Sequence, residues 1–332
     1  MTESRALIYA LHFARLKTCA VAGLAFSELA HAMDVGYVLR PGVVAAAVLL
    51  LAPMLAAGLW PAFFAGLGRL LPRSLRVGGP AVLCVPYALT AWSFGMFKWG
   101  WLAVYALLPV AVAFLLDQAQ SADTKQRGNW RDFVVLLALG LAVDLRWLEP
   151  AWPRGLAAVG KILLLDAGIF GFLVVRRLDG VGFDLRLKVR DLRRGLGEFC
   201  LYALIAIPLG LGLGFLHVHW IWPSALEAMG AFVFTFLFVA IPEELFFRGW
   251  VQNLLERRVG RNVALILTAV LFGLAHWNKR IVNFSGNLNW RYVLMAAIAG
   301  VFYGRAWRAQ RRIGAAAITH ASVDTTWSLW LR

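Results

Sequence analysis

Long apolar segments recur along almost the whole chain, and they constrain its fold more than any other feature. A helix needs about 20 mostly apolar residues to cross a bilayer, and the segments that fall short would need flanking residues or protein shielding. Their residues do not alternate between apolar and polar, as they would in membrane β-strands. The pattern therefore predicts an all-α, polytopic transmembrane helical bundle with about 8–10 spans. The candidate spans are 42–68, 79–97, 101–116, 133–148, 156–175, 198–216, 228–247, 263–277, 292–303 and 313–331.

Composition supports this fold class. Of the 332 residues, 61% are hydrophobic and 15% are charged, which is too little charge to cover the surface of a soluble domain of this size. The first forty residues are apolar but interrupted by Arg15, Lys17, Glu28 and Asp34. They could form an interfacial helix or an imperfect first span, and both interpretations stay open.

The formal net charge of +15 is concentrated in alternate loops. Basic loops lie near residues 69–76, 125–131, 176–194, 257–261 and 305–312, whereas the Trp-rich loops 149–153 and 217–223 are poor in Lys and Arg. By the positive-inside rule, the basic loops are cytoplasmic and the C-terminus is outside. We expect membrane lipid, and no nucleic acid, as the partner of this charge. An Arg-rich, Lys-poor composition suggests a bacterial-type plasma membrane.

The basic stretch 176–194 is the best internal boundary. No repeat relates the two sides, and few charges interrupt the apolar segments before it. We therefore expect an N-terminal transmembrane helical region of unknown role, residues 1–180, followed by a second unit, residues 181–332.

The run Glu243-Glu244-Leu245-Phe246-Phe247-Arg248 places two carboxylates and a guanidinium at the end of an apolar segment. Ionisable groups inside a membrane are costly, usually face the protein interior and mark function. Glu244 and Arg248 are four residues apart, so they can pair on one helical face. That pairing would leave Glu243 for chemistry, since two adjacent buried carboxylates do not readily both ionise. A purely structural ion-pair cluster is the alternative.

Two further apolar segments carry histidines. In a helical hairpin that turns between Val259 and Gly260, Glu243 and His276 are equidistant from the turn and share a depth of roughly 20 Å. His320 and Asp324 are four residues apart and project from one face of the last segment. We expect the three segments to meet in one buried pocket. A separation of Glu243 from both histidines by more than about 10 Å would rule that pocket out.

Three motifs on separate segments together resemble a known family. Glu243-Glu244-x-x-x-Arg248, Phe272-x-x-x-His276 and His320-x-x-x-Asp324 are similar to the motifs of the CAAX-protease and bacteriocin-processing (CPBP) family of intramembrane proteases, also called the abortive-infection family. The resemblance covers about residues 181–332 and implies that this part is a CPBP-type protease core. It also implies a catalytic cavity within the membrane.

The resemblance implies a role for each motif residue. Glu243 would be the general base that activates water, assisted by His276, and Glu244 would pair with Arg248. His320 and Asp324 would stabilise the oxyanion, while Phe272 would pack the site.

Position 324 departs from the family pattern, because many members carry Asn there. An ionised Asp cannot donate a hydrogen bond to an oxyanion. Asp324 is therefore either protonated or orients His320 through a ring nitrogen, and the second role is the more natural one.

A catalytic divalent metal such as zinc is the main alternative chemistry. Glu243, His276 and His320 could supply two imidazoles and a carboxylate, with a position open for water. We favour the glutamate-type mechanism without a cofactor, because Glu244 and Arg248 already balance the local charge. A metalloprotease stays the alternative.

These observations predict an intramembrane endopeptidase, similar to a type 2 CAAX prenyl protease, that cleaves a membrane-anchored or lipid-modified peptide or protein. The other class is a non-enzymatic transporter or scaffold that has kept the motif residues. A transporter would be expected to show repeated halves, and the sequence shows none.

Overall fold

The computed structural model describes residues 39–220, 222–277 and 289–331, and every regular element in these ranges is a helix. The first forty residues lie almost entirely outside them. The N-terminal half contains α4 (Pro41–Leu59), α5 (Pro61–Leu70), α6 (Arg73–Gly78), η1 (Gly79–Leu83), α7 (Cys84–Ser93), α8 (Trp99–Ala122), α9 (Trp130–Asp144), η2 (Glu149–Ala151), α10 (Ala157–Ile169) and η3 (Phe170–Val175). The C-terminal half contains α11 (Val189–Gly212), α12 (Ala225–Thr235), η4 (Phe236–Ala240), α13 (Ile241–Glu244), η5 (Leu245–Gln252), α14 (Asn253–Val259), α15 (Arg261–Leu274), α16 (Trp290–Gln310) and α17 (Ile313–Trp330).

The all-α class is confirmed, and each of the ten expected spans lies on one or more of these helices. Several helices in the described ranges are shorter or more polar than an isolated span requires. Five are long and apolar enough to cross a membrane, so the chain is a multi-pass membrane protein: Pro41–Leu59, Trp99–Ala122, Ala157–Val175, Val189–Gly212 and Ala225–Val259.

The acidic motif lies on one continuous stretch of helix, Ala225–Val259, which contains two π-helical stretches. We refer to this whole stretch as the rod. The stretch Phe236–Ala240 comes just before Pro242, which has no N–H to donate to the preceding turn. The rod ends at Gly260, whose φ of +80° suits glycine, and α15 begins at the next residue. The expected turn of the hairpin is therefore present at the expected residues.

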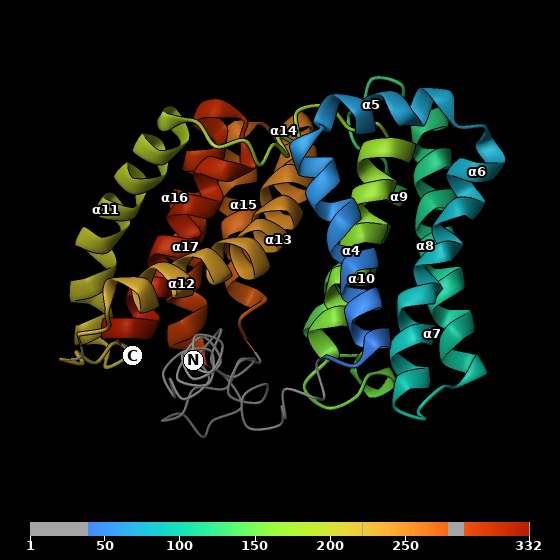
Figure 1. Cartoon of the computed structure of the whole chain (residues 1–332). Coiled ribbons are helices and arrows are strands. Elements are labelled where there is room, and N and C mark those ends of the chain that lie inside the picture. The colour runs from blue at the N-terminus through green and yellow to red at the C-terminus, as the bar shows by residue number, and fades with distance from the viewer. Residues whose placement is uncertain (1–38, 221, 278–288, 332) are drawn as a thin grey trace.

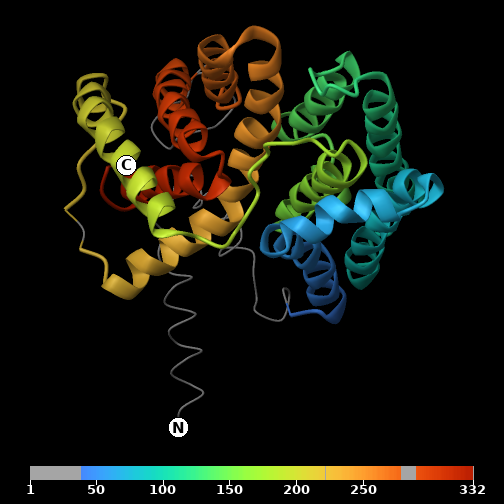
Figure 2. The same ribbon diagram turned by 90° about the horizontal axis from the view of Figure 1, so that it is seen from above.

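Two groups of helices lie side by side, α4–α10 and α11–α17, and the linker 176–188 joins them (Figures 1 and 2). Their apolar core is continuous. The ring of Phe172 stacks on that of Trp250, with 4.9 Å between the ring centroids. The division at residue 180 stays a prediction.

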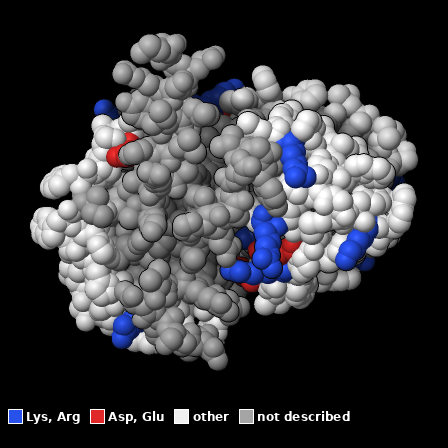
Figure 3. All heavy atoms as spheres, turned by 60° about the horizontal axis from the view of Figure 1, so that its bottom comes forward, with Lys and Arg blue, Asp and Glu red and all other residues white. Residues whose placement is uncertain are grey.

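The basic loops gather at one end of the molecule, the upper end in Figure 1. Arg257 donates to the carbonyl of Gln126 (3.0 Å), and Arg312 Nη1 lies 2.9 Å from Asp184 Oδ2. At the opposite end, the His217 N–H donates to the carbonyl of Leu331 (3.1 Å). On the described part of that end, basic side chains gather at one place beside acidic ones and are otherwise scattered (Figure 3). The two kinds of loop thus lie at opposite ends, as the positive-inside pattern requires.

Candidate active site

Glu244 is the centre of the polar cluster. Its side chain is fully buried at the end of α13, and its Oε1 accepts a hydrogen bond from Arg248 Nη1 (3.1 Å). The same oxygen lies 2.8 Å from His320 Nδ1 on α17. The predicted pairing of Glu244 with Arg248 is therefore present, and Glu244 also holds the histidine.

Arg248 is fully buried, and its charge is compensated on several sides. Its Nη2 donates to the carbonyl of Gly300 on α16 (2.9 Å). The guanidinium carbon lies 4.7 Å from the ring centroid of Phe272 and 5.2 Å from that of Tyr303. Ring faces attract a cation at such distances. Arg248 thus fixes the acidic helix against α15 and α16.

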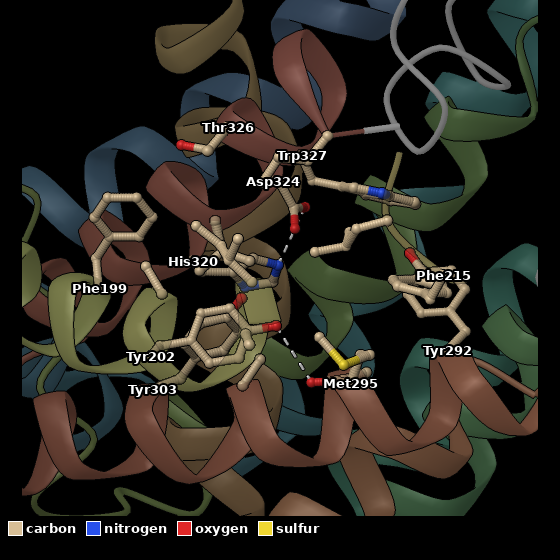
Figure 4. A pocket seen from close by; sticks show the side chains of 18 of the residues that line it. Phe199, Tyr202, Phe215, Tyr292, Met295, Tyr303, His320, Asp324, Thr326 and Trp327 are labelled. Atoms are coloured by element: carbon tan, nitrogen blue, oxygen red, sulfur yellow. Dashed lines mark hydrogen bonds and ion pairs between the residues drawn. The ribbon is translucent and has the colours of Figure 1, made fainter. Parts of the chain in front are cut away.

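His320 faces carboxylates on both ring nitrogens. Its Nε2 lies 3.4 Å from Asp324 Oδ2 and 3.9 Å from Glu243 Oε2. The ring of Tyr303 stacks on the imidazole, with 4.6 Å between centroids (Figure 4). Carboxylate oxygens accept hydrogen bonds, so an imidazole protonated on both nitrogens satisfies this arrangement. Asp324 therefore lies where it can orient His320.

His276 contacts Phe272, as His320 does. Its Nδ1 lies 2.8 Å from the carbonyl oxygen of Phe272, which can only accept, so Nδ1 carries a proton. The Phe272 ring lies 4.8 Å from the His276 ring and 5.7 Å from the His320 ring, between centroids. Phe272 thus contacts both histidines; the resemblance implied that it would pack the site.

A cavity of about 70 Å³ opens beside these groups (Figure 4). A water molecule needs about 10–15 Å³ by this measure, so the space can hold a few waters or one side chain of moderate size. The cavity continues to Leu216 and Leu331, at the end of the molecule opposite the basic loops. Its polar and aromatic walls come from α11, α15, α16 and α17: Tyr202, Phe272, His276, Tyr292, Tyr303, His320, Asp324 and Trp327.

Three tyrosines of this cavity, Tyr202, Tyr292 and Tyr303, did not stand out in the sequence. Each lies in an apolar segment, where a tyrosine normally indicates packing. Tyr303 contacts both Arg248 and His320, and only the packing of α16 against α17 brings it there.

The side chains do not form a metal-binding set as they stand. Among the described residues, no group of three or more His, Cys, Asp or Glu side chains could together hold a metal ion. Glu243 and His320 lie near one another, but with His276 they do not make the proposed ligand set. No reaction step is therefore derived through a metal, and metal dependence is a matter for experiment.

Comparison with known proteins identifies the region that carries these residues. Residues 224–326 match the family model described as type II CAAX prenyl endopeptidase Rce1-like. No curated protein and no solved structure matched the chain. The matched region begins at the N-cap of α12 and contains all seven motif residues, from Glu243 to Asp324. The similarity to type II CAAX prenyl endopeptidases of the Rce1-like family therefore covers residues 224–326 of the 332-residue chain.

Proposed function

We propose that the protein is an intramembrane endopeptidase that hydrolyses a peptide bond in a membrane-anchored or lipid-modified peptide or protein. One observation carries the proposal. Two adjacent carboxylates, Glu243 and Glu244, meet the imidazole of His320 from a separate helix, at 3.9 and 2.8 Å, beside a cavity that can admit water. A structural ion pair between helices would not need that cavity.

In the proposed reaction, Glu243 removes a proton from a water molecule as its oxygen attacks the scissile carbonyl carbon. His276, which lines the same cavity, helps to orient this water. The proton then passes from Glu243 to the leaving amine as the C–N bond breaks. General acid–base catalysis of this kind contributes about 10²- to 10⁴-fold to a rate.

His320 supplies the positive side of the site. When the substrate carbonyl displaces the 3.4 Å contact with Asp324, the N–H at Nε2 can donate to the developing oxyanion. Glu244 holds the opposite nitrogen at 2.8 Å, and Arg248 holds Glu244. A buried setting strengthens these charge interactions relative to water.

The test compares peptide products in membranes that contain the parent protein, Glu243→Gln or Glu227→Gln. Glu227 lies on the same rod but in an exposed capping box, and Gln can preserve that cap. New peptide termini should appear with the parent and Glu227→Gln, and should fall by about 10²-fold or more with Glu243→Gln. Equal product formation by the parent and Glu243→Gln would favour the transporter or scaffold alternative.

Metal removal separates the two protease mechanisms. The glutamate-type mechanism predicts that the purified protein keeps its activity after treatment with a strong chelator and dialysis. Loss of activity that added Zn²⁺ restores would establish a metalloprotease instead, while leaving the endopeptidase assignment intact.

A further inference from the structure

A second, larger cavity lies at the basic end of the molecule, where the two groups of helices meet. Its volume is about 560 Å³, and its walls come from α5, the loop after α8, η3, the linker and the turn between α16 and α17. It is separate from the candidate active site, because none of the motif residues lines it. The lining residues are Pro61, Ala65, Arg69, Gln120, Gln126, Leu173, Arg177, Leu178, Asp179, Gly180, Val181, Gly182, Phe183, Asp184, Arg311 and Arg312.

The lining carries four arginines and two aspartates, which leaves two positive charges in excess. Two of the arginines have acidic partners within the protein. Arg312 pairs with Asp184 (2.9 Å) and Asp191 (3.0 Å), and Arg311 pairs with Glu256. Burial raises the pKa of Asp184, but hydrogen bonds from Arg186 and Arg312 outweigh that effect and hold the pKa below its ordinary value. The charges of Arg311 and Arg312 are therefore already paired with carboxylates of the protein.

The other two arginines, Arg69 and Arg177, have no such partner. Within the described residues, neither guanidinium forms a hydrogen bond or an ion pair, and the Nε of Arg177 is buried without an acceptor. Both side chains line the cavity. A buried donor without an acceptor is uncommon, and on a residue that lines a cavity it leaves a hydrogen bond available to a bound group.

The backbone of Arg177 has a strained conformation. Its φ is +50°, in the left-handed region that non-glycine residues seldom adopt. The side chain of Gln126 fixes this conformation, because its Nε2 donates to the carbonyl of Arg177 (2.9 Å) and its Oε1 accepts from the N–H of Asp179 (2.9 Å). Backbone strain of this kind is typical of ligand-binding positions.

The chemistry of the walls identifies the class of ligand. A guanidinium presents a fork of N–H donors that matches the oxygens of a phosphate. Leu173, Val181 and Phe183 add apolar surface beside the charges, which a free phosphate would not use. Basic pockets between transmembrane helices at the cytoplasmic interface commonly bind lipid headgroups.

We propose that this cavity binds the phosphate headgroup of an anionic phospholipid, with Arg69 and Arg177 as the phosphate ligands. The lipid would lie between α5 and η3 on one side and the Arg311–Arg312 turn on the other. That turn leads directly into α17, the helix of His320. The bound lipid therefore stabilises the junction between the N-terminal helices and the helices of the candidate site.

The experiment measures lipid binding by the full chain in detergent, without reference to its activity. Thermal unfolding is followed against the concentration of added phosphatidylglycerol, phosphatidylcholine or inorganic phosphate, since a ligand that binds the native state raises the unfolding temperature. The test variant is Arg69→Gln/Arg177→Gln. The matched control, Arg190→Gln/Arg193→Gln, removes the same charge from exposed side chains at the same end but outside the cavity. Ala65→Trp fills the cavity while keeping both guanidinium groups.

We expect phosphatidylglycerol to stabilise the parent at concentrations at least tenfold lower than phosphatidylcholine or inorganic phosphate. The test variant and Ala65→Trp should each weaken that effect by about tenfold or more, and the control should keep it. An equal loss in the test variant and the control would show general surface attraction and overturn the proposal. Equal protection by inorganic phosphate would overturn the lipid as ligand. Equal protection by phosphatidylcholine, which has the same phosphate but no net charge, would overturn the preference for an anionic headgroup. If the double variant does not fold, Ala65→Trp decides the matter, because retention of full lipid binding by that variant contradicts the proposal.

Discussion

At the scale of single residues, the site depends on how His320 is held between acidic side chains. Glu244 lies 2.8 Å from Nδ1, while Asp324 lies 3.4 Å from Nε2. The long contact faces the cavity and the short one faces the protein interior. Glu244 and Asp324 thus lie at opposite nitrogens of the ring. The role inferred for Asp324 from the sequence, support of the histidine, stays a prediction.

Substitution of Asp324 distinguishes support of His320 from direct contact with the oxyanion. If Asp324 orients the imidazole, Asp324→Asn keeps an acceptor and should retain activity within about tenfold of the parent. Asp324→Ala removes the acceptor and should lose about 10- to 100-fold, because the imidazole then loses one of the carboxylates that hold it before the substrate binds. The measurement is kcat/KM on a cleaved peptide. Ser322→Ala is the control, since among the described residues the Ser322 hydroxyl donates to the carbonyl of Ile318 on its own helix. Higher activity of Asp324→Asn than of the parent would show that position 324 contacts the oxyanion itself.

At the scale of helices, small residues let α15 and α16 approach closely. A Cβ added at Gly273 would lie 2.5 Å from the carbonyl oxygen of Val293, and one added at Gly300 would lie 3.0 Å from the Cα of Ala269. Small residues have this role in many membrane helix pairs. The approach matters for the site, because the carbonyl of Gly300 accepts the hydrogen bond from Arg248.

Gly273→Ala should therefore destabilise the protein by about 1–3 kcal/mol, because the added methyl group forces α15 away from α16. Proteolytic activity should fall as well, since Arg248 would lose its contact with α16. The control is Gly197→Ala on α11, where an added Cβ meets nothing within 4 Å. That change should be neutral or slightly stabilising. Thermal unfolding in detergent compares the two variants, and equal unfolding temperatures would contradict the packing argument.

At the scale of the whole molecule, the basic loops and the candidate active site lie toward opposite ends. The basic loops share the end that carries α5 and α14, whereas the candidate active site opens toward Leu216 and Leu331, near the C-terminus (Figure 1). If the basic end is cytoplasmic, the substrate reaches the site from the other side of the membrane.

Cysteine labelling tests this orientation. In a background without the native cysteines, Trp222→Cys places a thiol in an exposed position near the C-terminal end, and Arg190→Cys places one at the basic end. A membrane-impermeant maleimide should label Trp222→Cys in intact cells and Arg190→Cys only after permeabilisation. The reverse pattern would place the basic loops outside and the opening of the site in the cytoplasm.

The apolar segments were sufficient to predict the helical class, since a segment that crosses lipid must satisfy its own backbone hydrogen bonds. The predicted span 42–68 is divided between α4 and α5, and five of the ten predicted spans lie on helices long and apolar enough to cross a membrane. Helical spacing likewise predicted that Glu244 could pair with Arg248, and Asp324 with His320, because residues four apart share a face. Each of these predictions depends on contacts within one segment. The hairpin turn at Gly260 depended on the order of two adjacent segments and was predicted for the same reason.

Contacts between distant segments were decided by the tertiary structure alone. The sequence carries no signal that His320 Nδ1 meets Glu244, that Tyr303 stacks on the imidazole, or that His276 bonds to the carbonyl of Phe272. The cavity at the basic end is a further case, because its arginines come from α5, the linker and a turn more than a hundred residues later. Local periodicity fixes which face of a helix a side chain occupies, but only the packing of helices in three dimensions fixes what that face meets.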